Sequence, residues 1–135
     1  MNTKDVRDHL RLLLPEDVFL NVYAVNELPK KKIQQSEWCL VCNCCPSQRV
    51  GEHWIAIYYH KGKLDFFDSF GLSPESYAVD LLRFIAIQTC DVAYNAQKLQ
   101  SYNSDACGHY CIIFFDVSMA RRKYGGNCSK NAADG

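Results

Sequence analysis

Three residues in this sequence, Cys107, His53 and Asp68, have the side chains that a thiol nucleophile and its activating groups require. Cys107 opens a segment rich in apolar residues and lies at the predicted start of a helix, where free backbone N–H groups favour a thiolate. A free cysteine is, however, more often a small buried hydrophobe. A thiol nucleophile also needs a base within hydrogen-bond reach and a third group that orients the base. Reactivity of Cys107 therefore depends on elements that bring both groups to it.

A predicted hairpin brings a base and an acid together. The runs 53–59 and 64–67 are rich in β-branched and aromatic residues, and a short connection containing Gly62 joins them. His53 opens the first strand and Asp68 follows the second, so both side chains are expected at the same end of the sheet. The other histidines, His9, His60 and His109, are expected to be solvated or packed imidazoles.

The hydrophobic pattern predicts an α+β fold with a mixed, mostly antiparallel sheet and flanking helices. Helices are predicted over 3–14, 73–87 and 107–123, and strands over 19–25, 38–44, 53–59, 64–67 and 92–99. Pro15 ends the first helix, and Ser73 with Pro74 is expected to begin the second. The third is apolar on nearly every side in its first half, which predicts a central buried helix carrying Cys107.

Length and charge limit the classes of function. The chain has 135 residues, and one domain is expected over 1–126, followed by a flexible tail over 127–135. Fifteen basic residues balance fifteen acidic ones, so nucleic-acid binding is not expected. The sequence shows no signal-peptide pattern and no apolar run long enough to span a membrane. We expect a monomer inside the cell, with reduced thiols.

Four of the eight cysteines are clustered. They are Cys39, Cys42, Cys44 and Cys45. Their spacing does not form two C-x-x-C arms, and no histidine follows at a metal-ligand interval. Alternation along a strand explains them more simply, so no metal is expected.

The motifs around the three candidate residues follow the order of one protease family. They are His53-Trp54, Phe67-Asp68-Ser69-Phe70-Gly71, and the run from Gln100 to Cys107-Gly108. The chain resembles the adenovirus-type, adenain-like cysteine proteases, which are in the same clan as the ubiquitin-like-protein (SUMO-type) proteases. The similarity extends from about residue 19 to residue 111. The seven-residue interval from Gln100 to Cys107 resembles that of the viral enzymes more than that of the SUMO-type proteases.

The resemblance implies a papain-like cysteine protease core and a role for each matching residue. His53 would activate Cys107, Asp68 would orient His53, and Gln100 with the Cys107 backbone N–H would form the oxyanion hole. Trp54 would wall the cleft, with a buried core tryptophan as an equal alternative, and the Gly51-Glu52 turn beside it would contact substrate. Cofactors are not required.

The resemblance also implies substrates and partners. These would be viral or virus-derived precursor proteins cut at glycine-containing sites, in the host nucleus or cytoplasm and in the virion. Cys90 lies near the position at which the viral enzymes bind an activating peptide by a disulfide, but a buried or idle thiol is favoured there. Few residues follow Cys107, so activation by DNA is not expected.

Two other functions are alternatives. The first is a deconjugating protease for ubiquitin or a ubiquitin-like modifier, which would use the same four residues. The second is an inactive relative that only binds glycine-rich tails. All four chemical roles are filled in this sequence, which disfavours the inactive relative.

Overall fold

The computed structural model describes residues 2–44, 53–95, 97–99 and 106–124, with the side chains of 122–124 excepted. The described elements are α1 (Thr3–Leu13), β1 (Phe19–Ala24), η1 (Val25–Glu27), β2 (Glu37–Cys44), β3 (His53–His60), β4 (Lys63–Phe67), η2 (Pro74–Ser76), α2 (Val79–Gln88), β5 (Asp91–Tyr94) and α3 (Cys107–Tyr124). The predicted tail over 127–135 lies outside these residues, and the single-domain boundary at 126 stays a prediction.

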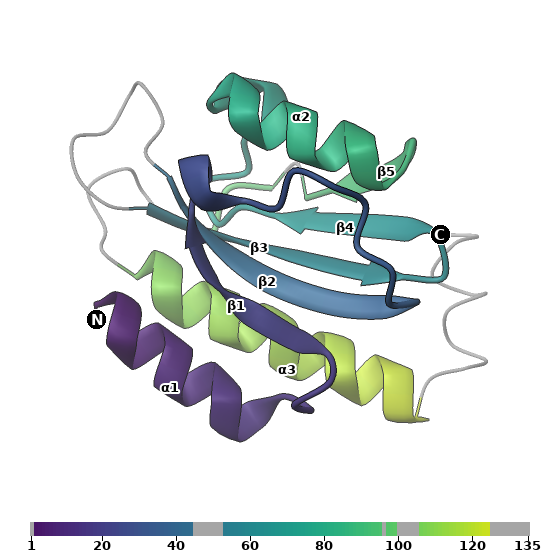
Figure 1. The fold of residues 1–135 in the computed structure, drawn as a ribbon. Coiled ribbons are helices and arrows are strands. Elements are labelled where there is room, and N and C mark those ends of the chain that lie inside the picture. Colours follow the sequence, from purple (N-terminus) through teal and green to yellow (C-terminus); the bar gives the residue numbers. More distant parts are fainter. Residues whose placement is uncertain (1, 45–52, 96, 100–105, 125–135) are drawn as a thin grey trace.

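The five strands form one mixed sheet in the order β1-β2-β3-β4-β5. The inner pairs β2/β3 and β3/β4 are antiparallel, whereas the outer pairs β1/β2 and β4/β5 are parallel. Helices α1 and α3 lie on one face of the sheet and α2 lies on the other (Figure 1). The predicted α+β class is confirmed, but the expectation of a mostly antiparallel sheet is correct only for its centre.

Strand β3 is buried on both faces and divides the core in two. Trp54, Ala56 and Tyr58 pack in the cluster that contains residues of α1 and α3. Ile55 and Ile57 pack in the cluster that contains residues of α2. Successive side chains of a strand point to opposite faces, so a strand covered on both sides is apolar throughout rather than alternating.

The hairpin between β3 and β4 is tight. Lys61 and Gly62 both have positive φ, 51° and 83°. Two central residues of positive φ are the mark of a type I′ turn, whose twist matches that of the flanking strands. The predicted hairpin is therefore confirmed.

Two predicted elements begin or end elsewhere. The helix expected over 73–87 is divided into the short η2 and the later α2, and the Ser73 side chain makes no capping hydrogen bond. The strand expected over 92–99 stops at Tyr94 as β5. The prediction of one helix over 73–87 failed because Ser73 and Pro74 begin a 3-10 turn, after which Tyr77 and Ala78 are extended.

Helix α3 is not central, contrary to the prediction from its apolar sequence. Cys107, Cys111 and Phe115 recur every fourth residue and are buried against the sheet. Ile113 and Val117 on the other side are about half exposed, at 57% and 46%. No helix in the described part of the chain has the length and apolar character that crossing a membrane requires.

The cysteine cluster of β2 is divided between the two faces of the sheet. Cys39 packs in the core beneath α3, whereas Cys42 and Cys44 pack on the side of α2. The predicted strand alternation is confirmed for these three, and Cys45 lies outside the described residues.

Two glycines give a matched test of backbone packing. Gly71 has φ +74°, and a Cβ there would lie 2.7 Å from the Gln97 carbonyl carbon and from the Lys98 nitrogen. Gly62 has φ +83°, and a Cβ there would meet nothing. We expect Gly62→Ala to lower the free energy of unfolding by about 1 kcal/mol, and Gly71→Ala by about 3 kcal/mol or more, because the second adds a backbone clash.

Urea unfolding of the two glycine variants measures this difference. Equal losses of stability would show that the segment at 97–98 moves away freely from the turn at Gly71.

Candidate active site

The structure joins His53 and Asp68 in a buried pair. His53 is the first residue of β3, and Asp68 directly follows β4. The His53 Nε2 atom lies 2.7 Å from Asp68 Oδ1, and both side chains are fully buried. The expectation that the hairpin would bring imidazole and carboxylate to one end of the sheet is confirmed.

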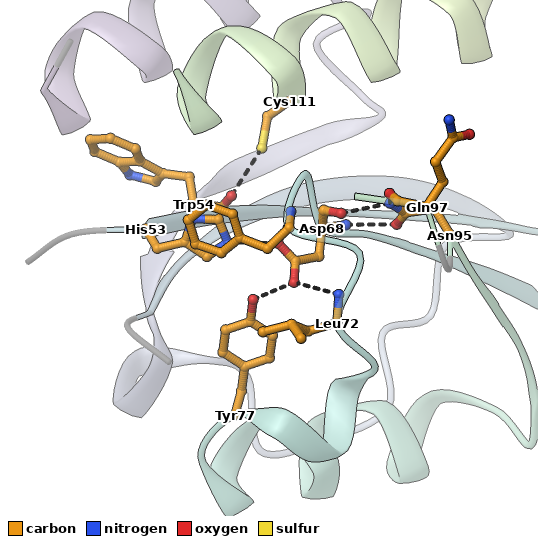
Figure 2. A network of polar contacts seen from close by, with 9 residues as sticks. His53, Trp54, Asp68, Leu72, Tyr77, Asn95, Gln97 and Cys111 are labelled. Carbon is orange, nitrogen blue, oxygen red and sulfur yellow. Dashed lines mark hydrogen bonds and ion pairs between the residues drawn. The ribbon is translucent and has the colours of Figure 1, made fainter. Parts of the chain in front are cut away.

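The Asp68 carboxylate accepts hydrogen bonds on both oxygens. Oδ1 accepts from the Phe70 backbone N–H at 3.0 Å in addition to His53. Oδ2 accepts from the Leu72 backbone N–H at 3.2 Å and from the Tyr77 hydroxyl (Figure 2). Hydrogen bonds to both oxygens replace the water that a carboxylate loses on burial, and so stabilise its charged form.

One side chain bonds both backbone groups of Asp68, and the Asp68 carbonyl also accepts from the Gly71 N–H at 2.8 Å. Asn95 Oδ1 accepts from the Asp68 N–H at 2.9 Å, and Asn95 Nδ2 donates to the Asp68 carbonyl at 2.6 Å. Asn95 directly follows β5, so these bonds connect the turn at Asp68 to the neighbouring parallel strand.

Aromatic rings fix the plane of the His53 imidazole. Phe70 stacks on it with ring centroids 4.0 Å apart, and the Tyr77 ring is nearly parallel at 6.0 Å. Nε2 is the ring nitrogen directed at Asp68, so Nδ1 is the one that does not contact the carboxylate. A carboxylate beside Nε2 favours the tautomer that has its proton there, which leaves the Nδ1 lone pair to act as a base.

Cys107 lies beside this imidazole. It is the first residue of α3 and only 1% exposed. Burial lowers the pKa of His53, but hydrogen bonding to Asp68 and to the Cys107 thiol, and the charges of both groups, outweigh burial and raise it. A cationic imidazole and a helix N-terminus both favour the thiolate over the thiol.

Three other buried cysteines have raised thiol pKa values, which disfavours the thiolate form that a nucleophile needs. Burial raises the pKa of Cys111 well above its ordinary value, and it raises that of Cys39 to about 12. A hydrogen bond with Cys42, together with burial, raises the pKa of Cys44. The Cys111 thiol also donates to the Trp54 carbonyl at 3.4 Å, which ties α3 to β3 (Figure 2).

The remaining predicted site residues have different outcomes. Trp54 is buried in the core cluster that also contains Cys107, as the alternative of a core tryptophan requires. Cys90 is exposed between α2 and β5, so the thiol is not buried, and the expectation that it is idle stays a prediction. Gly51, Glu52 and Gln100 lie outside the described residues, and their roles stay predictions. Within the described ranges, His, Cys, Asp and Glu form no group that could hold a metal ion.

Sequence reasoning missed Phe70, Tyr77 and Asn95. Phe70 was part of the recognised motif but received no role. Tyr77 was assigned to the interior of a helix, and Asn95 to the interior of a strand. Only the position of Asn95 after the apolar pair Val92-Ala93 could have indicated the end of a strand, where polar side chains often serve a site.

The raised pKa of His53 gives a prediction about stability and pH. The stabilisation from protonated His53 is fully present below its unfolded pKa of about 6.5 and is lost as the pH rises through the higher folded value. Asp68→Asn removes the charge while burial remains. We therefore expect the variant to lower the pKa of His53 and to lose more stability near pH 5.5 than near pH 8.5.

NMR titration of His53 and urea unfolding at the two pH values test this expectation. Asp8→Asn, which alters an exposed carboxylate paired with Lys4, is the control and should show little change. An unchanged His53 pKa in Asp68→Asn would contradict the assignment of Asp68 as its electrostatic partner.

Comparison with known proteins finds similarity to adenovirus proteases. No protein-family model matches the chain. It is 32% identical over 94 residues to the protease of Bovine adenovirus C serotype 10, covering 60% of this chain and 48% of that protein. It is 30% identical over 90 residues to the protease of Bovine adenovirus B serotype 3, covering 56% of this chain and 44% of that protein.

These matches confirm the resemblance that the motifs indicated. The chain spans about half the length of the curated relatives it matches. Over more than half of its own length, this chain is similar to the proteases of two bovine adenoviruses.

Proposed function

We propose that this chain is a cysteine protease in which Cys107 is the nucleophile, His53 the general base and Asp68 the residue that orients His53. The observation that carries the proposal is the buried His53–Asp68 contact beside a cysteine that begins a helix. A papain-like core accords with α3 packing on the sheet. The two adenovirus relatives, each named a protease, support the same activity.

The geometry gives each group a step in peptide hydrolysis. Nδ1 of His53 takes the thiol proton of Cys107, and the thiolate attacks the peptide carbonyl to form a tetrahedral oxyanion. Collapse of this intermediate breaks the C–N bond, and the imidazolium returns its proton to the leaving amine. Water, deprotonated by His53, then hydrolyses the thioester and regenerates the thiol.

Asp68 stabilises the ion pair that precedes the attack. The imidazolium would be costly in a buried site without an opposite charge. Because Asp68 is held by donors on both oxygens, it faces Nε2 throughout the reaction without reorganising.

The oxyanion would be bound by the Cys107 backbone N–H at the start of α3 and by the Gln100 side chain. The first donor lies at the N-terminus of a helix, where the helix dipole favours a negative charge. The role of Gln100 rests on the family resemblance.

Substrates are proposed to be viral or virus-derived precursor proteins cut at glycine-containing sites. A ubiquitin-like modifier is the alternative substrate. The exposed Cys90 thiol is accessible to an activating peptide, as the resemblance implies. We propose a monomer that acts in the host cell or the virion and requires no cofactor.

Substitution of the nucleophile and the base tests the activity. We expect Cys107→Ala and His53→Ala to abolish cleavage of peptides that contain Gly-Gly, since neither attack nor proton transfer is then available. His60→Ala, at the far end of the same strand, should retain activity because His60 lies remote from the site.

Electrophilic probes built on ubiquitin-like modifiers distinguish the two substrates. Probe labelling without peptide cleavage would favour the deconjugating protease. Full activity of Cys107→Ala would show that another residue is the nucleophile.

Gln100→Ala tests the oxyanion donor. Loss of one preorganised donor should lower kcat by about 100-fold with a smaller change in KM, since the bond forms mainly in the transition state. Gln97→Ala, an exposed glutamine of the same segment, is the control. Equal kcat values for the two variants would remove Gln100 from the mechanism.

A further inference from the structure

We propose that Asn95 is a positioning residue, which aims the Asp68 carboxylate at His53 by fixing the backbone of Asp68. This inference rests on the proposed function, since it assigns a role in the same site. Its basis is the pair of hydrogen bonds by which one side chain satisfies both backbone groups of Asp68.

The need for such a residue arises where the sheet ends. The β3/β4 ladder ends at Phe67, and the β4/β5 ladder pairs Phe66 with Tyr94, the last residue of β5. Asp68 is one residue beyond the first ladder, two residues beyond the second, and fully buried. Its backbone N–H and C=O therefore have no partner on a strand, although the carbonyl also accepts from the Gly71 N–H of its own turn at 2.8 Å. The Asn95 amide presents an acceptor and a donor there, and thus continues the sheet by one residue.

The other donors to Asp68 do not replace this connection. The N–H groups of Phe70 and Leu72, which bond the carboxylate, and of Gly71, which bonds the backbone carbonyl, belong to the same turn as Asp68. They shape the turn, but they do not fix it relative to the sheet on which His53 lies. Tyr77 fixes the carboxylate from one side, and Asn95 fixes the backbone from the neighbouring strand.

The segment that follows Asn95 is also anchored at the site. Asn95 Nδ2 donates to the Gln97 carbonyl at 3.2 Å, and the Leu99 N–H donates to the Ser69 carbonyl at 2.7 Å. The Leu99 carbonyl accepts from the hydroxyl of Tyr110, on the first turn of α3, at 3.0 Å. Residues near Asn95 therefore contact both the turn that holds the acid and the helix that holds the nucleophile.

Movement of the Asp68 carboxylate away from His53 should change the pKa of His53. The described titratable groups around this imidazole are Asp68, Cys107, Tyr77 and, opposite it on β2, Cys44. Asp68 raises the pKa of His53 against the lowering effect of burial. If the carboxylate moves away, burial remains and the pKa of His53 must fall.

The experiment compares Asn95→Ala and Asn95→Ser with Gln97→Ala in the full chain. For Asn95→Ala we expect a fall of about tenfold in kcat with little change in KM, because the base is misoriented rather than the substrate released. The pKa of His53, measured by NMR, should fall, and the acid limb of the pH–rate profile should shift to lower pH. Gln97→Ala should match the parent protein in both measurements.

Asn95→Ser decides the question if the alanine variant does not fold. Serine leaves a smaller void and a polar group, but it cannot reach both backbone groups of Asp68 at once, so the pKa of His53 should still fall. A variant at position 95 that is folded and has the parent kcat and His53 pKa would overturn the inference. Lower thermal stability without a change in that pKa would also overturn it, since it would show a structural role only.

The two proposals fail in different ways. If the parent protein cleaves no peptide and reacts with no probe, the proposed function is wrong. The His53 titration still decides the role of Asn95 in that case, since it requires no substrate.

Discussion

The contact between the Asp68 carboxylate and the His53 imidazole is the constraint on which the rest of the site depends. Both groups are fully buried at the end of a sheet. Removing an ionised carboxylate from water costs several kcal/mol unless donors replace the lost water. The turn after β4 and the Tyr77 hydroxyl supply these donors to the carboxylate, and the Asn95 amide bonds the backbone of the same residue. The local structure around Asp68 therefore places hydrogen-bond donors where they stabilise the buried charge of its carboxylate.

The topology explains how distant residues reach this carboxylate. Strands β4 and β5 are parallel, so the chain must cross over the sheet between them. This crossover begins at Asp68, passes Tyr77 and α2, and returns through β5 to Asn95. Asn95 at the end of the crossover thus contacts Asp68 at its start, and the antiparallel hairpin on the other side supplies His53.

Environment, rather than residue type, separates Cys107, the proposed nucleophile, from the other buried cysteines. Cys107 and Cys111 are one turn apart on the same buried face of α3. Cys107 begins the helix and adjoins an imidazole whose pKa is raised. Cys111 is enclosed by apolar groups and donates to a backbone carbonyl, and its pKa is raised well above the ordinary value.

The sequence by itself determined the hairpin, the helix that begins at Cys107 and the family resemblance, because turn chemistry, apolar runs and motif order are local properties. It also indicated that His53 and Asp68 would meet, since a short hairpin leaves little freedom. Only the tertiary structure decided the side of the sheet on which α3 packs and its half-exposed outer face. It alone showed that Tyr77 and Asn95 converge on Asp68, because those contacts join residues brought together by the crossover and have no local signal.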